Sequence, residues 1–180
     1  MRKVVYGVGI SLDGYIARRD GSVDFLFMPT DYSMAAFFKR IDLAVMGRKT
    51  YEMGVKMGGG SFDGQGMKCY VFSRTIEAGE HGGAIFTAES PAEFVKELRN
   101  KKGKDVWLMG GGELAREFLR EDLVDELYLG VVPVLIGEGI AAFPSGFPQR
   151  EFTLIDNKTF SKGLIVLRYE QTGTKKRAQK

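Results

Sequence analysis

The sequence predicts a single α/β domain, built on a mostly parallel central sheet that helices flank, with an antiparallel pair of strands near its C-terminus. A chain of 180 residues is long enough for one domain with a full core and too short for two. Strand and helix patterns alternate over the first two-thirds of the chain, and strand patterns then follow alone. This order is typical of a parallel sheet with an antiparallel edge. The domain is expected to cover residues 1–171, followed by a basic, disordered tail over residues 172–180.

The chain is expected to begin with two strands and a helix. Residues 3–11 are rich in β-branched and aromatic types, which favours a strand, and the turn pair Asp13-Gly14 ends it. Residues 15–17 form a short apolar return before a second turn at Asp20-Gly21. Residues 31–40 fit a helix, because apolar side chains recur there at intervals of three and four: Met34, Phe37, Phe38 and Ile41.

The middle of the chain holds shorter elements. Residues 43–46 are a continuous apolar run, as expected of a strand that is buried on both faces. Gly47 ends this strand, and residues 48–53 are predicted to form a short helix. Residues 54–67 contain six glycines and no apolar period, so a flexible loop is expected there. Two further short strands are expected at residues 70–73 and 84–86.

The last third of the chain begins with a helix and ends with strands. A helix is expected from Ser90-Pro91 to about Asn100, because Ser90 can cap it and Glu93 completes a capping box. The elements expected after it are a buried strand at 106–109, an amphipathic helix at 113–120, and strands at 125–136, 150–160 and 163–170, the last two joined by a hairpin at Gly163.

Charge and composition narrow the functional class. The formal charge is +3, but residues 175–180 hold four cations, and without these four the charge of the chain is −1. A nucleic-acid-binding domain gathers its cations on one folded face. No nucleic acid is therefore expected as a partner, and such a role would depend on the tail alone.

The single cysteine and the single histidine exclude an intramolecular disulfide and make a structural zinc site of four ligands untenable. No cleavable apolar N-terminal segment is visible, and no apolar run approaches the roughly 20 residues of a membrane helix. A cytoplasmic protein with no membrane partner and no bound metal is expected. Cys69 is expected to be buried, Trp107 to lie in the core, and His81 to be exposed in a loop.

Two junctions between a strand, a glycine turn and a helix carry the predicted chemistry. In the first, Gly47 follows a buried strand, and Arg48, Lys49 and Thr50 open the next helix. A helix N-terminus exposes unpaired backbone N–H groups and about half a positive charge, and glycine lets an anion approach the backbone closely. The side chains add two cations and a hydroxyl. This predicts a nucleotide phosphate site, and the alternative is a tight turn with two solvated cations.

The second junction repeats the pattern with Gly110, Gly111 and Gly112, after which Glu113 opens a helix. Three glycines permit close ligand approach and positive φ angles, although they lack the spacing of the G-x-G-x-x-G fingerprint. The alternative is that the next helix crowds this turn and leaves space only for glycine. Both junctions fall at the carboxyl ends of predicted parallel strands, where open α/β sheets bind ligands, and this favours a binding role.

A third candidate follows the strand near residue 72. Ser73 and Arg74, with Thr75 beside them, are suited to hold a 2′-phosphate, the group that distinguishes NADPH from NADH. The alternative is an ordinary polar turn.

These pieces resemble the dihydrofolate reductase family in their order and approximate spacing. The matching segments are Val45–Glu52, Val71–Arg74, Trp107–Gly112 and Glu126–Leu129. Two others, Ser11–Ile16 and Pro133–Gly139, more closely resemble the reductase domain of riboflavin biosynthesis and its stand-alone relatives. The resemblance covers about residues 3–170.

The resemblance implies a dihydrofolate-reductase-like fold, NADPH as the hydride donor, and a pocket between the first strand, the first helix and the glycine-rich turn. It also implies that Asp13 lies beside the reacting substrate and is the catalytic candidate, although Asp13-Gly14 is equally consistent with a simple turn. By matching position, the cofactor-binding residues would be Gly47, Arg48, Lys49 and Thr50 for phosphates, Ser73 and Arg74 for the 2′-phosphate, and Gly110, Gly111, Gly112 and Glu113 for the pyrophosphate region.

The activity that the resemblance implies is reduction of a small molecule. In the riboflavin-type reaction, hydride reduces the open-chain ribose of 5-amino-6-(5-phosphoribosylamino)uracil. No deaminase motif (H-x-E with P-C-x-x-C) is present, so only the reductive step is expected. A homodimer is also expected, with the apolar strand 130–136 contributing to it. The alternatives are a reductase of dihydrofolate, another pterin or a small carbonyl compound, and a non-catalytic nucleotide-binding module.

One departure from the folate reductases concerns the substrate. Those enzymes place a carboxylate on the first helix, about four residues before a Phe-Lys-Arg segment, where it contacts the pterin. Here Met34 stands four residues before Phe38, and a methionine can neither polarise nor protonate a pterin. This argues against folate reduction. Asp31 and Lys39 are secondary candidates for substrate contacts, and both fit a solvated helix surface better.

Overall fold

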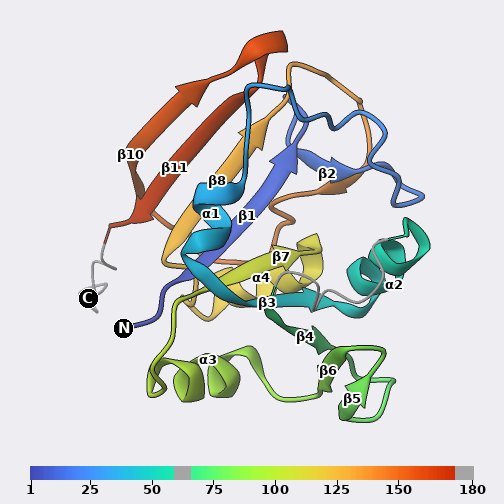
Figure 1. Ribbon diagram of the computed structural model, residues 1–180, viewed down its shortest axis with the longest axis vertical. Coiled ribbons are helices and arrows are strands. Elements are labelled where there is room, and N and C mark those ends of the chain that lie inside the picture. The colour runs from blue at the N-terminus through green and yellow to red at the C-terminus, as the bar shows by residue number, and fades with distance from the viewer. Residues whose placement is uncertain (59–65, 173–180) are drawn as a thin grey trace.

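The computed structural model describes residues 1–58 and 66–172, and its centre is a nine-stranded sheet with the strand order β10-β11-β8-β1-β7-β3-β4-β6-β5 (Figure 1). The six strands from β8 to β6 in this order are parallel, while β10 and β11 at one edge and β5 at the other are antiparallel to their neighbours. This confirms the predicted architecture. The strands are β1 Val4–Ile10, β3 Ile41–Gly47, β4 Lys68–Phe72, β5 Gly79–His81, β6 Ala84–Thr87, β7 Asp105–Gly110, β8 Glu126–Val131, β10 Phe152–Thr159 and β11 Ile165–Gln171.

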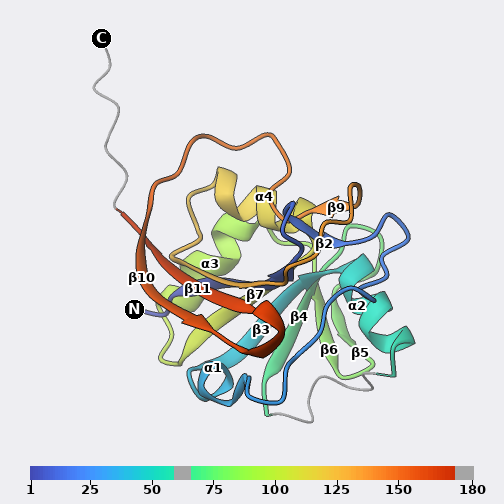
Figure 2. The ribbon, with the colours of Figure 1, turned by 90° about the horizontal axis from the view of Figure 1, so that it is seen from above.

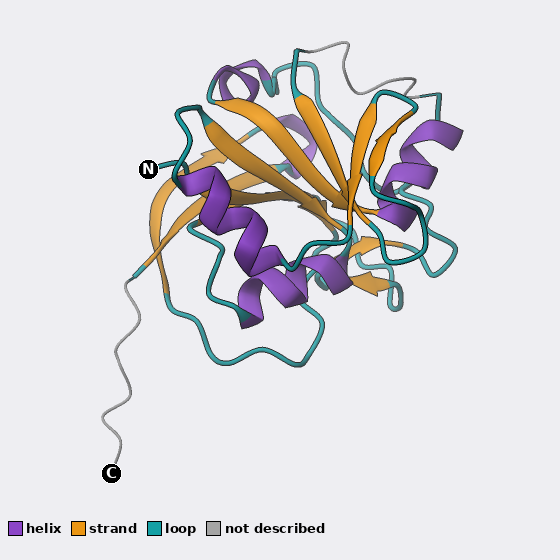
Figure 3. Ribbon diagram, turned by 90° about the horizontal axis from the view of Figure 1, so that it is seen from below, coloured by secondary structure: helices purple, strands orange, loops and turns teal. Residues whose placement is uncertain are grey.

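Helices cover both faces of this sheet (Figures 2 and 3). Phe94 and Phe118, from α3 and α4, pack in the main core with Val45 of β3. Tyr51 of α2 packs instead with Met46, the next residue of β3, whose side chain points to the opposite face. Thus α3 and α4 share one face, and α1 and α2 lie on the other. The helices are α1 Ala35–Lys39, α2 Arg48–Lys56, α3 Pro91–Arg99 and α4 Gly112–Arg120.

The central strand β1 has glycines where its second face is crowded. Tyr6 is fully buried in the main core, whereas Gly7 and Gly9 face the side of α1. A Cβ at Gly7 would lie 2.9 Å from Nε1 of Trp107, and one at Gly9 would lie 3.2 Å from the Leu26 side chain. Glycine at these two positions therefore makes room for Trp107 and Leu26 against the strand.

Two local predictions are confirmed in detail. The Ser90 hydroxyl caps α3 by accepting a hydrogen bond from the Glu93 N–H at 3.3 Å and donating one to the Glu93 carboxylate at 2.8 Å. Gly163 turns the last hairpin with a φ of 80°, at the end of a 3₁₀ turn that spans Ser161–Gly163. Cys69 is buried as expected, and burial raises the pKa of its thiol to about 11.

Two helix boundaries were predicted incorrectly. The first helix begins at Ala35, not at residue 31, because Asp31 accepts hydrogen bonds from Ser161 and the Ser33 hydroxyl accepts the Ala35 N–H. Helix α2 continues to Lys56, so residues 54–56 of the predicted glycine loop are helical. The rest of that prediction falls partly on residues 59–65, and the predicted tail on residues 173–180, which lie outside the described residues.

The strand assignments need three corrections. Strand β8 ends at Val131 instead of residue 136, because Pro133 has no N–H for the ladder and the Val134 N–H turns back to the carbonyl of Val132 at 2.8 Å. An unpredicted strand, β9 (Ile140–Ala141), pairs with β2 (Tyr15–Ala17) in a separate two-stranded sheet. His81 is exposed as predicted but lies at the end of β5 and not in a loop.

Candidate active site

The two predicted glycine junctions meet at the carboxyl edge of the sheet. Strands β3 and β7 are neighbours, and Met46 pairs with Gly110 in their register. A Cβ on Gly47 would lie 3.9 Å from the backbone nitrogen of Gly111 and 4.0 Å from the carbonyl oxygen of Gly110. The two turns are therefore in van der Waals proximity, although they are separated by about 60 residues of chain.

Both turns lead directly into helices whose first backbone N–H groups have no side-chain cap. Gly47 is the N-cap of α2 and Gly111 is the N-cap of α4, and neither cap receives a side-chain hydrogen bond. The first-turn N–H groups of a helix have no partner within the helix, and together they carry about half a positive charge. Two such ends side by side form a site that favours an anion with more than one phosphate group.

The glycines of these turns differ in what a side chain would meet there. Gly110 has a φ of 97°, a conformation that favours glycine, and its peptide bond to Gly111 is cis. A Cβ on Gly112 would lie 2.4 Å from the carbonyl oxygen of Ala141, so packing excludes any side chain there. Packing excludes nothing at Gly47, where the nearest atom to a Cβ is 3.9 Å away. Crowding thus accounts for Gly112 but not for Gly47.

The side chains that open α2 and α4 differ in how much of their charge is neutralised. Arg48 pairs with Glu52 at 2.5 Å, one turn along α2. Lys49 is exposed and has no hydrogen bond or ion pair with any described residue. Glu113 is exposed and pairs with Arg116 at 2.5 Å. Among the described residues of these two turns, Lys49 is therefore a free cation, whereas the carboxylate of Glu113 would repel a phosphate that reached it.

Thr50 of α2 lies beside the glycine turn at the end of β7. The Thr50 Oγ1 is 3.4 Å from the position that a Cβ on Gly111 would take. The structure thus places Thr50 of the first junction against a glycine of the second, and their role as phosphate ligands remains a prediction.

Ser73 and Arg74 lie one strand further along the same edge. Strand β4 pairs with β3, and Phe72 lies opposite Gly47. Ser73 is buried, and its hydroxyl accepts the N–H groups of Thr75 and Ile76 at 3.2 and 3.0 Å, which fixes the turn. Arg74 projects from that turn, is exposed, and has no partner among the described residues. Ser73 therefore shapes the turn, and Arg74 is free to bind an anion.

Asp13 connects two loops beyond the ends of β1 and β8. Its carboxylate accepts hydrogen bonds from the Ser11 hydroxyl at 2.6 Å and from the N–H groups of Ile136 and Gly137, at 3.2 and 2.7 Å. The Ser11 hydrogen bond lowers the pKa of Asp13, and the two backbone N–H groups lower it further. These contacts hold the carboxylate ionised, and its catalytic role remains a prediction.

An apolar pocket of about 400 Å³ opens on the face of the sheet that carries α1 and α2. Strands β1, β7 and β8 form its floor, and the segment between β2 and α1 forms one wall. Trp107 is on β7, three residues before Gly110, so the floor lies about 10 Å from the glycine turns. The lining residues are Gly7, Val8, Gly9, Val23, Leu26, Phe27, Met28, Tyr32, Met34, Met57, Trp107, Tyr128, Gly130, Val132 and Leu164.

The pocket corrects one prediction and agrees with two others. Trp107 was expected in the core, but it lines the pocket and donates its indole N–H to the carbonyl of Gly7 at 2.8 Å. Met34 lines the pocket just before α1, so the position expected of a folate-reductase carboxylate holds a thioether. Asp31 accepts hydrogen bonds from Ser161, and Lys39 is exposed, and neither lines the pocket.

Tyr32 and Tyr128 are the functional candidates that the sequence analysis missed. Both line the pocket, and burial, together with the neighbouring hydroxyl of Tyr128, raises the pKa of Tyr32. Tyr32 precedes Met34, the first residue of the apolar period in the predicted helix, so no pattern singled it out. Alternation along β8 could have placed Tyr128 on the pocket face, opposite Leu127 and Leu129.

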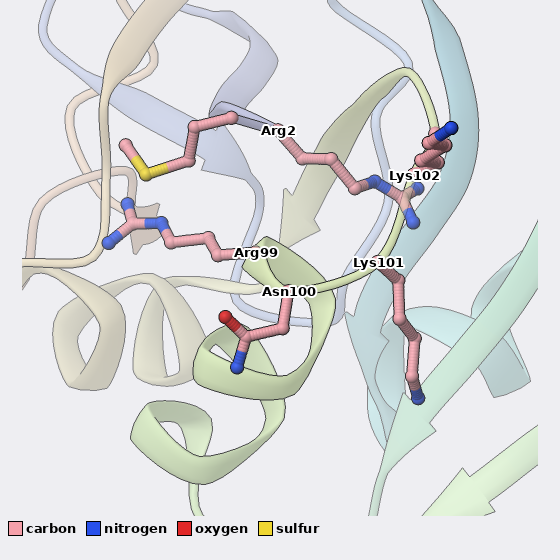
Figure 4. Close-up of a pocket in the computed structure, with 7 residues that line it drawn as sticks. Arg2, Arg99, Asn100, Lys101 and Lys102 are labelled. Atoms are coloured by element: carbon pink, nitrogen blue, oxygen red, sulfur yellow. The ribbon is translucent and has the colours of Figure 1, made fainter.

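A second cavity lies at the opposite end of the sheet, and it is lined by Arg2, Arg99, Lys101 and Lys102 (Figure 4). Its arginines point in opposite directions (Figure 4). Arg2 pairs with Asp42, Arg99 with Asp125 at 2.8 Å, and Lys101 with Glu97 at 3.3 Å. Because most of this charge is neutralised within the chain, the carboxyl edge is the better phosphate site.

Neither a metal-binding cluster nor a membrane-spanning helix is found among the described residues. Within residues 1–58 and 66–172, no group of three or more His, Cys, Asp or Glu side chains is arranged to hold a metal ion. In the same part of the chain, no helix has the length and apolar character needed to cross a membrane.

A family model, a curated protein and a crystal structure each match nearly the whole chain. A family model described as the RibD C-terminal domain matches residues 2–166. The Bacillus subtilis protein YwjB is 34% identical over 166 residues, which cover 91% of this chain and 95% of YwjB. The crystal structure of a Shewanella protein named for riboflavin biosynthesis matches with a TM-score of 0.83 and 25% identity, over 96% of this chain and 100% of the other.

A third relative shares the fold at lower identity. The Thermotoga maritima diaminohydroxyphosphoribosylaminopyrimidine deaminase/5-amino-6-(5-phosphoribosylamino)uracil reductase matches with a TM-score of 0.72 and 16% identity. The match covers 95% of this chain and 57% of the Thermotoga chain. The fold of this protein is therefore the dihydrofolate-reductase-like fold of the RibD proteins, as the resemblance implied.

Proposed function

This chain belongs to the family of RibD C-terminal domains, and from that premise we propose that it is an NADPH-dependent reductase of a small molecule. The observation that carries the proposal is the pair of uncapped helix N-termini, behind Gly47 and Gly111, that meet at the carboxyl edge of the sheet. A dinucleotide has a pyrophosphate that suits two adjacent N-termini. The apolar pocket on the same side then receives the reacting groups.

The residues of this edge fit the cofactor in charge and in shape. Gly47, Lys49, Thr50 and Gly111 would hold the phosphates, because they offer bare backbone, a free cation and a hydroxyl. Arg74 would bind the 2′-phosphate, since it is exposed and unpaired with described residues. When bound, the reduced nicotinamide supplies a hydride from its C4, which with a proton from solvent reduces a carbonyl to an alcohol and leaves NADP⁺.

The chain itself contributes orientation and exclusion of water. The pocket floor is rigid, because β1, β7 and β8 are central parallel strands and Trp107 is fixed by its hydrogen bond to Gly7. Holding two reactants in a productive geometry can lower the barrier by about 7–11 kcal/mol. The apolar wall from the β2–α1 segment keeps solvent away from the reacting carbon.

Two substrate classes are compatible with this activity. The riboflavin-type reaction on 5-amino-6-(5-phosphoribosylamino)uracil is supported by family membership. Reduction of another carbonyl compound is supported by the apolar lining of the pocket, in which no described residue carries a charge. A homodimer and a cytoplasmic location remain predictions. The dimer prediction used an apolar strand over residues 130–136, and in the structure this strand ends at Val131.

The test compares NADPH with NADH in thermal shift and direct titration, using the wild type, Arg74→Ala and the matched control Lys158→Ala. Lys158 is exposed on β10, at the far edge of the sheet. NADPH should bind the wild type more tightly than NADH. Arg74→Ala should weaken NADPH binding by about tenfold to a hundredfold while leaving NADH binding unchanged, because a charge-assisted hydrogen bond contributes about 1.5–3 kcal/mol. Equal binding of both nucleotides by all three proteins would refute the assignment of the 2′-phosphate.

A further inference from the structure

The pocket beside the glycine turns has a lining that restricts its substrate. Apolar and aromatic side chains supply most of the surface, including Leu26, Phe27, Met34 and Trp107. Among the described residues that line it, none carries a charge. Its volume of about 400 Å³ lies within the range of small-molecule sites. An ionised group placed here would lose its hydration without gaining a counter-charge, which is strongly unfavourable.

Two carboxylates next to the pocket in sequence already have partners outside it. Asp24 follows the lining residue Val23, and its carboxylate pairs with Arg18 at 2.6 Å. Asp31 precedes the lining residue Tyr32, and its carboxylate accepts hydrogen bonds from the N–H and hydroxyl of Ser161, at 2.9 and 2.7 Å. These groups are therefore not available to a ligand, and the chemistry of the pocket depends on its neutral members.

The polar groups that remain for a ligand are two phenol hydroxyls. The indole N–H of Trp107 already donates to the carbonyl of Gly7. Tyr32 and Tyr128 both line the pocket and pack against the same cluster of buried apolar side chains. A phenol hydroxyl can donate one hydrogen bond, so each of these two side chains can bind an acceptor atom of a ligand.

We propose that this pocket takes an uncharged, planar aromatic compound that carries a carbonyl group, and that the Tyr32–Tyr128 pair binds the carbonyl oxygen. The aromatic and apolar lining, which includes Phe27 and Trp107, suits a planar ring, and the two hydroxyls would bind its single polar atom. The inference builds on the proposed reductase function and names the class of substrate for the same site. It favours a compound without phosphate over a phosphoribosyl compound.

Trp107 makes the pocket directly observable, because it is the only tryptophan of the chain. Its fluorescence reports ligand binding without any turnover. Three probes share one ring system: 2-acetylnaphthalene is uncharged and has a carbonyl, 2-naphthoate has a negative charge, and naphthalene has no polar atom. We expect 2-acetylnaphthalene to bind the wild type at least tenfold more tightly than 2-naphthoate. Equal or tighter binding of 2-naphthoate would overturn the proposal.

Three variants assign the roles of the lining residues. Tyr32→Phe and Tyr128→Phe should each weaken binding of 2-acetylnaphthalene severalfold and leave naphthalene unchanged, since only the hydroxyl contact is lost. Met34→Lys should bind 2-naphthoate more tightly than 2-acetylnaphthalene, because it places a cation in the pocket. If neither tyrosine variant changes the affinity for the ketone while both melt like the wild type, the assigned hydroxyl pair is wrong.

The same proteins separate this inference from the reductase proposal. NADPH titration tests the nucleotide site and does not depend on the three aromatic probes. If the wild type does not bind NADPH but still prefers 2-acetylnaphthalene to 2-naphthoate, the reductase proposal is refuted and the proposed ligand class of the pocket stands. Normal NADPH binding with a preference for 2-naphthoate would refute the substrate class and leave the reductase proposal standing.

Discussion

Replacing Gly47 by alanine tests whether this glycine serves binding or folding. Its φ of −79° and ψ of 156° are accessible to alanine, and the new Cβ would lie 3.9 Å from the nearest atom, an ordinary contact. The expected cost to the free protein is that of alanine at a helix N-cap, about 1 kcal/mol. For a chain of this size, such a change lowers Tm by about 2–4 °C.

The cost to nucleotide binding should be larger. The added methyl group would stand between the N-terminus of α2 and the Gly110–Gly111 turn, where the phosphates are proposed to bind. Displacing a phosphate from one charge-assisted hydrogen bond forfeits about 1.5–3 kcal/mol. The Kd for NADPH should therefore rise by about tenfold to a hundredfold. Isothermal titration with NADPH, beside thermal melts of the free protein, measures both effects.

Gly112→Ala provides the matched control. Its Cβ would lie 2.4 Å from the carbonyl oxygen of Ala141, so this variant should destabilise the free protein by about 1–3 kcal/mol through overpacking. The two variants should thus separate, with Gly47→Ala affecting mainly binding and Gly112→Ala mainly stability. A Gly47→Ala protein that binds NADPH as the wild type does would refute the proposal that the phosphates lie against this glycine.

Two further changes test other parts of the structure. Glu126→Gln should destabilise the protein by about 3–5 kcal/mol in urea unfolding, because Glu126 is only 1% exposed and accepts hydrogen bonds from Arg40 at 2.8 Å and Arg168 at 3.1 Å. Burial raises the pKa of Glu126, but these hydrogen bonds outweigh burial and lower the pKa below its usual value. The stability that the Glu126 carboxylate contributes should therefore be complete at neutral pH and lost as the pH falls through its folded-state pKa. A free energy of unfolding that is the same at neutral and acidic pH would contradict this expectation. Asp13→Asn should speed hydrogen exchange at the Ile136 and Gly137 amides, and loss of turnover without that change would support a catalytic role instead.

The sequence predicted the sheet and both glycine junctions because each has a strong local signal. A short apolar run, a glycine and an amphipathic segment follow one another at both Gly47 and Gly110. The contact between the two turns has no such signal, since it depends on the pairing of β3 with β7. That the junctions lie at one edge followed from their position at the ends of parallel strands. Their close proximity required the strand order.

The weakest predictions concerned segments whose structure depends on distant partners. The sequence places Asp31 in a helix. In the structure, Ser161, 130 residues away in sequence, donates two hydrogen bonds to the Asp31 carboxylate and holds it outside the helix. Asp13 was a catalytic candidate on the basis of resemblance, and its contacts with residues 136–137 come from another loop. The pocket wall before Met34, formed by residues 23–32, has no regular period, so no pattern could identify it.

The central claim is that two helix N-termini, behind Gly47 and Gly111, bind the phosphates of NADPH. Amide chemical shifts of the labelled protein, recorded during an NADPH titration, test it most directly. The largest shifts should fall on the amides of Gly47, Arg48, Gly111 and Gly112, with smaller ones around Arg74. Shifts that centre on Arg2 and residues 99–103, at the opposite end of the sheet, with the glycine turns unchanged, would contradict the account.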